Sequence, residues 1–366
     1  MAGKFVQKKF ANINLNDSFF DSLKADYPGT ANSTGFVEWF GNKTVEGASA
    51  LLFEDEIGIG AFIVQKIENE PIELEDTVLS PKKRMKISTF RISERYRRQR
   101  IGEGAIGLLL WKWQKSDCSE IYVTVFDKHT TLISQFEKFG FYKCGRNLNG
   151  ENVLIKSREK IDFSDPYKSF PFIKGDFDHA GYIIIDDVYH DTMFAYSELA
   201  NHASLQTKIQ SSVTNGLSKI YVGSAPVPHH KVGEPVLVYR RYTQGAGKRY
   251  RSCITSYCVV TDVIQAKSNN RYLMTFDELK SRIGNKSVFN EIELQNQYNK
   301  NKNVIVVEML YFGYFGAGNN VNMDWLDSNG CWAVGDQYPT EVKLTIDQFK
   351  KILAEGKVNV SNVIIN

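Results

Sequence analysis

Hydrophobic positions in the first half of the chain follow two periods, and this pattern predicts a mixed α/β fold. Apolar residues that alternate or run together indicate strands, whereas apolar residues that recur every three or four positions indicate helices. The predicted order is strand, short helix, hairpin, strand, loop, helix, strand, helix and strand, ending with the strand "NVLIKS" at 152–157. Asp17 or Ser18 can cap the first helix, and Pro28 with Gly29 ends it.

The middle of this half carries the clearest pattern. Residues 84–92 read as a strand, residues 102–115 as a helix and residues 120–127 as a buried strand. Between the first strand and the helix, "ERYRRQR" places four arginines within seven residues. The first turn of a helix has free N–H groups and the positive end of the helix dipole, so nearby arginines deepen an anion site. The predicted ligand is a phosphate.

The second half is predicted to be a separate domain. Residues 158–178 break the periodicity with two prolines and many charges, which predicts a linker between domains at 1–157 and 179–366. After the linker one helix is clear at 275–284, with Thr275 as its cap. Strand patterns recur at 180–187, 218–224, 234–242, 250–266 and 303–312. The prediction for this half is a β-barrel-like α+β domain.

Composition supports this division and excludes some classes of protein. With 366 residues, of which 42% are hydrophobic and 24% charged, the chain has the composition of a folded protein with two domains. No apolar stretch is long enough for a signal peptide or a membrane span, which predicts a cytoplasmic protein without a membrane partner. Five cysteines without paired spacing predict reduced thiols and no metal.

Charge is informative only where it clusters. The net charge of +3 is too small to indicate a nucleic-acid binder. Between Lys82 and Arg100, however, nine residues are basic and only Glu94 is acidic. A local positive surface is therefore predicted in this segment.

Two motifs within residues 5–157 resemble the GNAT superfamily of acyl-CoA N-acyltransferases. The pyrophosphate loop of that family has the form Arg/Gln-x-x-Gly-x-Gly/Ala between a strand and a helix. The segment Arg97–Gly102 is similar to it, with Arg100 in place of the first glycine; the alternative register Gln99–Gly104 fits fully but lengthens the loop by two residues. "FEKFGF" at Phe136–Phe141 resembles the later family motif Tyr-Glu-x-x-Gly-Phe. The resemblance implies a GNAT fold, with a mixed central sheet flanked by helices.

The resemblance also implies acetyl-CoA as co-substrate and a set of residues that bind it. The diphosphate would lie at the loop before the helix, and backbone groups near Phe90 and Ile92 would hold the thioester carbonyl and the pantetheine arm. The residues implied in acetyl-CoA binding are Phe90, Arg91, Ile92, Arg97, Arg98, Gln99, Arg100, Ile101, Gly102, Glu103, His129 and Phe136.

The catalytic residues are less clear, because Phe136 stands where the family usually has a tyrosine that can donate a proton. The candidates for acid and base are His129, Tyr142 and Glu94. His129 can equally be a residue before a helix that bonds a carbonyl or a pantetheine amide. Tyr122 can instead serve as the acid, Glu68 can serve as the base through a water, and Asp127 can be either a catalyst or a helix cap.

The stretch from Lys231 to Ile264 resembles the PUA-like superfamily, including its ASCH and EVE branches. It has a turn glycine, an apolar strand ending in aromatic and basic residues, a flexible tip and the next strand. Such domains commonly read RNA or modified bases. The predicted nucleic-acid-binding residues are Tyr239, Arg240, Arg241, Tyr242, Lys248, Arg249, Tyr250 and Arg251. The alternative is a solvated hairpin whose aromatic residues pack on the sheet.

Together these resemblances predict an acetyl-CoA-dependent N-acetyltransferase. The favoured acceptor is an amine on tRNA, aminoacyl-tRNA or a nucleobase, as in a toxin module or a nucleic-acid modifier. A protein amine, a small polyamine or an antibiotic can take its place, and so can a role as an acyl-CoA-binding regulator with little activity. The expected partners are acetyl-CoA, RNA or DNA, and a protein partner or antitoxin. A nucleic acid would run from residues 239–251 toward a positive patch at 82–91.

Overall fold

The computed structural model describes residues 4–30, 34–194, 196, 197, 199, 212–333 and 339–365. The chain forms two compact units. Unit 1 comprises Met1–Gly102, Asp117–Phe136 and Phe141–Lys160, and unit 2 comprises Glu103–Ser116, Glu137–Gly140 and Ile161–Asn366. The predicted division at 158–178 stays a prediction.

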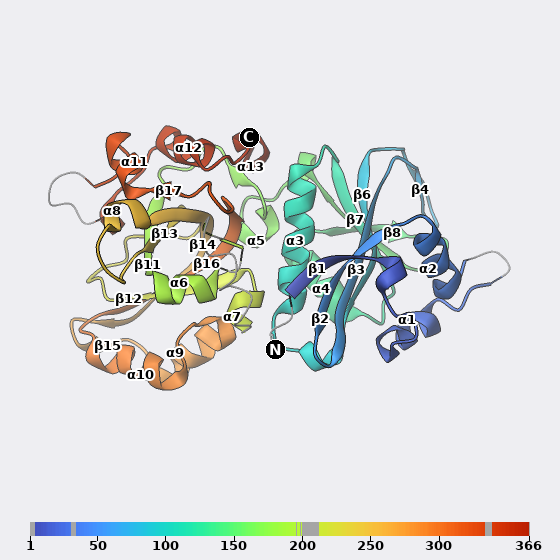
Figure 1. Ribbon diagram of the computed structural model, residues 1–366, viewed down its shortest axis with the longest axis horizontal. Coiled ribbons are helices and arrows are strands. Elements are labelled where there is room, and N and C mark those ends of the chain that lie inside the picture. Colours follow the sequence, from blue (N-terminus) through green and yellow to red (C-terminus); the bar gives the residue numbers. More distant parts are fainter. Residues whose placement is uncertain are drawn as a thin grey trace. The chain divides into compact units, whose positions relative to one another are not determined.

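Unit 1 is built on a seven-stranded mixed sheet with strand order β1-β2-β3-β6-β7-β9-β8 (Figure 1). Its pairs are antiparallel except β6 with β7, which is parallel. The strands are β1 (Lys4–Lys9), β2 (Ser49–Asp55), β3 (Gly58–Glu68), β6 (Arg84–Ile92), β7 (Glu120–Val125), β8 (Tyr142–Arg146) and β9 (Asn152–Ser157). A separate pair joins β4 (Ile72–Glu73) to β5 (Val78–Leu79).

The helices follow the predicted order with one addition. They are α1 (Asp21–Asp26), α2 (Phe36–Val45), α3 (Ile101–Lys115) and α4 (Thr130–Lys138), with 3-10 turns η1 (Phe10–Asn12), η2 (Ser18–Phe20), η3 (Glu94–Tyr96) and η4 (Arg158–Lys160). Asp17 caps η2 by accepting a hydrogen bond of 2.8 Å from the Phe19 N–H, which confirms the predicted cap. The additional helix, α2, buries Phe36 and Phe40 in an aromatic core with Phe10 and Phe20.

Unit 2 contains a second mixed sheet, with strand order β11-β13-β14-β16-β12 and two short strands on β14. The strands are β11 (Gly181–Asp186), β12 (Ser218–Gly223), β13 (Pro235–Arg241), β14 (Cys253–Ser268), β15 (Arg271–Tyr272), β16 (Val304–Tyr314) and β17 (Val321–Asn322). In the described residues β11 and β12 are the two ends of this order, so the sheet is open. The predicted β-barrel-like α+β domain is therefore confirmed in part: the domain mixes helices with a mixed sheet, but in the described residues the end strands do not pair to close a barrel.

Several helices of unit 2 begin with a strong cap. Thr275 caps α9 (Phe276–Ile283) in a reciprocal capping box with Glu278, as predicted. The same box begins α10 (Glu291–Lys300) at Asn290 and α12 (Ile346–Glu355) at Thr345. The remaining elements are α5 (Pro166–Ser169), α6 (Asp187–Met193), α7 (Ser212–Asn215), α8 (Lys248–Arg251), α11 (Met323–Ser328), α13 (Val360–Val363), η5 (Gly284–Lys286), η6 (Pro339–Glu341) and the pair β10 (Ile173–Lys174) with β18 (Ile364–Ile365).

Within unit 2, the part of α3 from Glu103 to Lys115 is held by specific contacts. The Glu103 carboxylate accepts a hydrogen bond of 2.7 Å from the Ser218 N–H, and the Trp111 indole donates one of 2.6 Å to the Phe312 carbonyl. A Cβ on Gly104 would lie 2.1 Å from the Asn215 carbonyl oxygen. This contact accounts for a glycine at 104 by packing alone. No described helix combines the length and apolarity needed to cross a bilayer.

Candidate functional site

The central opening of unit 1 lies between β6 and β7. β6 pairs with β3 along its whole length, but with β7 only from Arg84 to Ile87. From residue 88 to Ile92 the described ladder therefore continues on the β3 side alone, which leaves the other backbone edge of β6 without a strand partner. Phe90 and Ile92 lie on this part of the strand. A strand edge opened in this way can offer backbone groups to an extended ligand.

A β-bulge marks the end of the paired part. Val64 of β3 pairs with Thr89 and Gln65 pairs with Ile87, so Ser88 is an extra residue on β6. Bulges redirect side chains and are frequent next to active sites. A cavity of about 420 Å³ reaches Ser88, and Trp39 and Gln65 also line it.

The anion loop, defined here as Arg97–Gly102, connects η3 to the first turn of α3. Arg98 and Arg100 have φ values of 67° and 59°, in the left-handed region. For a residue with a Cβ this conformation costs about 1–2 kcal/mol, and glycine avoids that cost. The first N–H groups of α3, at Ile101 and Gly102, have no partner within the helix because of helix geometry. The loop thus carries local strain beside a natural anion-binding position.

Gly102 faces open space. A Cβ built on it would meet no atom within 4 Å, so packing does not require a glycine here. A residue without a side chain at the start of a helix does allow a ligand to approach the backbone closely. This geometry favours the register Arg97–Gly102, since Gly104 has a packing role of its own.

Arg91 and Phe136 are held inside unit 1. Arg91 Nε donates a hydrogen bond of 2.9 Å to the Phe19 carbonyl, and burial lowers the pKa of its guanidinium although Asp26 and Glu94 oppose this. Phe136 is fully buried, with its ring centroid 5.5 Å from that of Phe90. Its ring offers no exposed surface, so its predicted contact with acetyl-CoA could only be made through a rearrangement or through Phe90.

His129 lies immediately before α4, at the open end of β7. Its carbonyl accepts hydrogen bonds from the Leu132 and Ile133 N–H groups, as the residue before a helix commonly does. Its imidazole Nε2 is 3.4 Å from Asp26 Oδ2, and 42% of the side chain is exposed. Asp26 also contacts Lys128 in a shallow depression of about 470 Å³. The two predictions for His129, an acid or base and a residue before a helix, both stay open.

The three predicted catalytic residues do not form one site. Tyr142 lies opposite Ile155, which in turn lies opposite Tyr122, so Tyr142 is level with the paired part of β6 and β7. Val125, where β7 ends before His129, is three residues or about 10 Å further along the strand. Glu94 is 77% exposed and forms an ion pair of 2.6 Å with Arg97. That is a surface ion pair and not a buried base.

Tyr122 and Glu68, the other candidate acid and base, are brought together. The Tyr122 hydroxyl donates a hydrogen bond to the Glu68 carboxylate, and Lys66 forms an ion pair of 2.6 Å with the same carboxylate. Burial alone would raise the pKa of Glu68, but the contacts with Lys66 and Tyr122 outweigh it and lower the pKa. Burial, and then Glu68, raise the pKa of Tyr122. The pair therefore joins an ionised carboxylate that can accept a proton to a phenol that stays protonated.

The basic residues at 82–91 do not form a free positive patch. Lys83 contacts Asp117 at 2.5 Å, and buried Arg84 contacts Glu120 at 2.6 Å. Lys82 shares Glu120 at 2.9 Å. Acids from β7 and its preceding turn therefore neutralise these three charges, and the predicted path of a nucleic acid along 82–91 stays a prediction.

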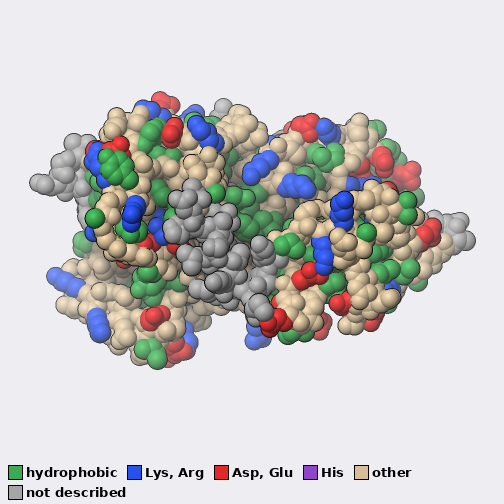
Figure 2. Space-filling view, viewed as in Figure 1, with side chains coloured by type: hydrophobic (Ala, Val, Ile, Leu, Met, Phe, Trp, Pro, Cys, Tyr) green, Lys and Arg blue, Asp and Glu red, His purple; other side chains and the backbone are tan. Residues whose placement is uncertain are grey.

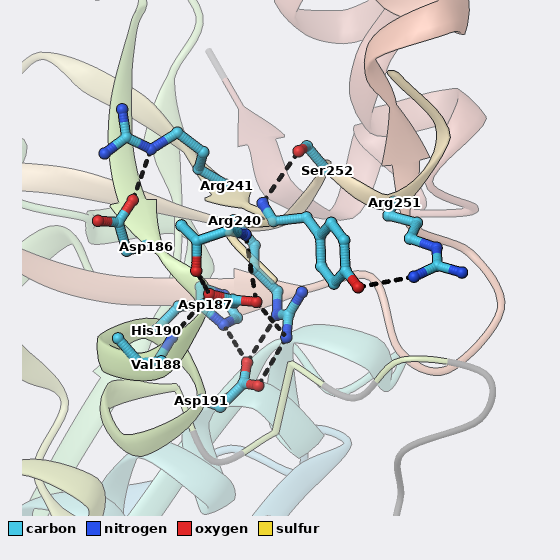
Figure 3. A network of polar contacts seen from close by, with 11 residues as sticks. Asp186, Asp187, Val188, His190, Asp191, Arg240, Arg241, Arg251 and Ser252 are labelled. Atoms are coloured by element: carbon cyan, nitrogen blue, oxygen red, sulfur yellow. Dashed lines mark hydrogen bonds and ion pairs between the residues drawn. The ribbon is translucent and has the colours of Figure 1, made fainter. Parts of the chain in front are cut away.

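The first residues of the basic hairpin, defined here as residues 239–251 between β13 and β14, are buried. Tyr239 is 4% exposed, and its ring lies 4.7 Å from that of Trp332. Arg240 is 6% exposed and donates two hydrogen bonds of 2.8 Å to Asp191 (Figure 3). Neither can stack on a base or bind a phosphate at the surface, so this part of the prediction is corrected. The Tyr239 ring packs inside unit 2, and Asp191 neutralises the charge of Arg240.

A buried polar network explains why Arg240 is held inward. The His190 imidazole is fully buried between Asp191, at 2.9 Å from Nδ1, and the Thr255 hydroxyl, at 2.7 Å from Nε2 (Figure 3). Burial lowers the pKa of His190. Burial alone would raise the pKa of Asp191, but hydrogen bonds from Arg240 and His190 hold it well below its usual range. The network fixes the base of the basic hairpin to α6.

The tip of the basic hairpin contains both ion-paired arginines and other exposed residues. Arg241 pairs with Asp186 at 2.5 Å, and Arg249 pairs with Asp324 at 2.6 Å and with Asp327 at 2.8 Å. On the face that Figure 2 displays, Lys and Arg side chains are interspersed with Asp and Glu. Arg241, Lys248, Arg249, Tyr250 and Arg251 are all exposed, and of these Lys248, Tyr250 and Arg251 are not among the residues described above as paired with an aspartate. Arg251 donates a hydrogen bond of 2.6 Å to the Tyr242 hydroxyl. This hydroxyl is neutral, so the contact does not neutralise the charge of Arg251.

Comparisons with solved structures return acetyltransferases and an ASCH protein. The ASCH protein from Zymomonas mobilis has 9% identity and a TM-score of 0.30, and the match covers 47% of this chain and 92% of that one. Ard1 from Thermoplasma volcanium has 14% identity and a TM-score of 0.29, with coverage of 42% and 95%. NAA60 from Arabidopsis thaliana, solved with acetyl-CoA, has 15% identity and a TM-score of 0.30, with coverage of 42% and 99%.

These scores are too low to carry an argument about fold or activity. A scan against protein-family models finds no match to the sequence. A search of curated proteins finds no match either. The chemistry of the site must therefore be argued from its own residues.

Sequence reasoning missed the contacts that hold the anion loop in place. Tyr96, in the middle of the arginines, is buried, and its hydroxyl donates a hydrogen bond to Asp55. Arg95 donates to the same carboxylate at 2.9 Å and is therefore not directed at a ligand. The available signal was Tyr96 itself, a single aromatic residue in a run of charged ones. In the described residues no cluster of three or more His, Cys, Asp or Glu side chains could hold a metal ion.

Proposed function

We propose that residues 1–157 form an acetyl-CoA-dependent N-acetyltransferase that transfers the acetyl group directly to an amine. The observation that carries the proposal is the separation of β6 from β7 after Ile87, followed directly by the anion loop and the start of α3. An extended thioester needs backbone partners along a strand edge, and its diphosphate needs converging N–H donors at a helix start. Both kinds of partner are supplied by one continuous segment.

In this proposal the chain positions the donor and handles protons. Backbone groups from Thr89 to Ile92 hold the pantetheine arm, and the N–H groups of Ile101 and Gly102 face the diphosphate. The amine nitrogen attacks the thioester carbonyl, the C–N bond forms, the C–S bond breaks, and the thiolate leaves and takes up a proton. Glu68, kept ionised by Lys66 and by the Tyr122 hydroxyl that donates to it, is proposed to accept the amine proton through a water and to return that proton through water to the leaving thiolate.

Two measurements test the activity. Isothermal titration of the full chain with acetyl-CoA is expected to show saturable binding, and absence of binding at millimolar ligand in folded protein contradicts the proposal. Release of free thiol in the presence of acceptors then separates an enzyme from an acyl-CoA-binding regulator. Binding without turnover favours the regulator, a result that Phe136 in place of tyrosine makes conceivable.

The proposed acceptor is an amine on a nucleic acid. Its support is the exposed group Lys248, Tyr250 and Arg251, which combines two cations with a stacking face. A protein amine is the second candidate, because most basic residues of the predicted nucleic-acid surface are already ion-paired. Labelled acetyl-CoA added to separate RNA, DNA and protein fractions decides between them. Label in the protein fraction alone contradicts the nucleic-acid acceptor.

A further inference from the structure

The turn that precedes the anion loop is fastened to the β2–β3 hairpin by one buried tyrosine. Tyr96 is 7% exposed, whereas the residues on either side of it are exposed. Its hydroxyl donates a hydrogen bond to Asp55 Oδ2, and its ring meets the Phe53 ring edge-on with centroids 5.1 Å apart. Asp55 is the last residue of β2, so this bond ties η3 to the end of that strand.

Two further contacts complete the attachment. Arg95 donates to Asp55 Oδ1 at 2.9 Å and to the Gly58 carbonyl at 2.8 Å, and its guanidinium lies 4.9 Å from the Tyr96 ring centroid. A Cβ on Gly60 would lie 2.3 Å from the Tyr96 ring, so the ring rests directly on the β3 backbone. Asp55 thereby holds both the aromatic and the basic residue of the turn.

The anion loop depends on this turn for its shape. The Tyr96 carbonyl accepts a hydrogen bond of 3.1 Å from the Gln99 N–H, which lies between the two left-handed arginines. Left-handed conformations of residues other than glycine persist only where the surroundings hold them. If Tyr96 moves, Arg98 and Arg100 can relax to ordinary φ values, and the N–H groups at the start of α3 lose their common direction.

We infer that Asp55 and Tyr96 are positioning residues for the diphosphate of the acyl-CoA donor. They touch no donor atom, but they set the conformation of the anion loop, in which an arginine replaces the expected glycine. The inference rests on the proposed acetyl-CoA site. It also gives Arg95 a role: this arginine holds the loop instead of binding phosphate.

The test compares two donors in the full chain. Acetyl-CoA contains the diphosphate, whereas acetyl-pantetheine has the same thioester without it. For Tyr96→Phe, the KM for acetyl-CoA should rise about tenfold with kcat unchanged, and kinetics with acetyl-pantetheine should not change. Asp55→Asn keeps an oxygen that can accept from the Tyr96 hydroxyl, so its KM should rise less, about threefold. Titration should show the same ranking of Kd values.

Tyr182→Phe is the matched control. Tyr182 is a fully buried tyrosine of unit 2 whose hydroxyl donates to the Cys331 carbonyl. Losing this hydroxyl removes a comparable buried hydrogen bond, and the Kd for acetyl-CoA should stay within twofold. Equal Kd values for wild type and Tyr96→Phe overturn the inference while the acetyl-CoA site stands. A parallel loss with both donors also overturns it, because that result indicates general damage.

Two results need a separate interpretation: a wild-type protein that binds no acetyl-CoA, and a Tyr96→Phe variant that does not fold. If wild type binds no acetyl-CoA, the proposed function fails and the inference fails with it. If Tyr96→Phe does not fold, hydrogen exchange of Asp55→Asn without ligand provides the independent measurement. Amides of residues 97–102 should then exchange faster than in wild type, and unchanged protection there overturns the inference.

Discussion

In the anion loop, Arg97 is 74% exposed and pairs with an equally exposed Glu94, whereas in the basic hairpin Arg240 is 6% exposed and doubly bonded to Asp191. Both segments are rich in arginine. The difference comes from residues distant in sequence: α6 and α11 supply aspartates to the hairpin. In the turn before the anion loop, Asp55 of β2 pairs with Arg95. Whether an arginine can bind an external anion therefore depends on which acidic side chains the fold places beside it.

Asp191→Asn should give the largest effect and tests the hairpin side of this comparison. The change leaves Arg240 buried beside a neutral amide, and breaking such a pair costs about 3 kcal/mol of unfolding free energy. Urea unfolding followed by circular dichroism measures it. Glu94→Gln, which removes the partner of an exposed arginine, is the control and should change stability by less than about 0.5 kcal/mol. A loss below about 1 kcal/mol for Asp191→Asn would show that Arg240 is not held as described.

The pH dependence of stability should come from the same network. Burial lowers the pKa of His190, so the native state resists its protonation, and stability should fall as pH drops through the unfolded value near ~6.5. The pKa of Asp191 is also lowered, so its contribution is present above ~4 and is lost as pH falls below that value. The urea midpoint should therefore decrease in two stages, the first as pH falls below about 6.5 and the second as it falls below about 4.

His190→Gln is the control for the first stage. The amide can bond to Asp191 and Thr255 without titrating, so the midpoint should be nearly flat between about pH 7 and 5. A wild-type midpoint that does not change over this range contradicts a neutral buried His190. Asp187 also faces this network, at 3.9 Å from Arg240. Because the first stage comes from His190, Asp187→Asn should leave the decrease in midpoint below about pH 6.5 unchanged.

Much of unit 1 could be predicted because its signals are local. The strand at 84–92 and the strand at 152–157 coincide with β6 and β9. The cap at Thr275 predicted α9 because a capping box lies within four consecutive residues. α2 was missed because no side chain caps its start at Gly35 and its apolar spacing, at Phe36, Trp39 and Phe40, extends over little more than one turn. The barrel-like part of the second prediction was not met for a different reason: strand patterns do not say whether the two end strands of a sheet will pair.

The candidate site was predictable where chemistry follows the chain. The anion loop and the part of β6 beside Phe90 are close in sequence; the run of arginines indicated the first, and the family resemblance implied the second. The pairing of Tyr122 with Glu68, and of Arg240 with Asp191, joins residues 54 and 49 positions apart. Such pairs depend on strand order and register, and a run of arginines carries no information about either.

Gly102→Ala should give the next largest effect, on acetyl-CoA binding, and it tests the anion loop. No atom lies within 4 Å of the added Cβ, and alanine favours a helix over glycine by about 1 kcal/mol, so stability should stay equal or rise. Acetyl-CoA binding should weaken about tenfold, or about 1.4 kcal/mol, because the methyl group stands where the diphosphate must approach. Isothermal titration and thermal unfolding are the paired measurements.

Gly41→Ala provides the control for Gly102→Ala. Gly41 lies in α2, and a Cβ there also meets no atom within 4 Å, so the same helix stabilisation is expected without any change in Kd. Unchanged binding in Gly102→Ala would place the diphosphate elsewhere. Equal losses in both variants would indicate an indirect effect of stabilising a helix.

The smallest effect concerns nucleic-acid binding by the basic hairpin. Lys248 and Arg251 are exposed, so the double variant Lys248→Gln, Arg251→Gln should remove two phosphate contacts and reduce the log–log salt slope by roughly 1.5 units. Arg249→Gln is the control: Asp324 and Asp327 already hold this arginine, so its loss should barely change the slope. Acetyl-CoA affinity should be unchanged in both variants. If Arg249→Gln reduces the slope as much as a free cation would, about 0.9 units, the aspartates release Arg249 to the nucleic acid, and ion pairing in the free protein does not decide which arginines bind.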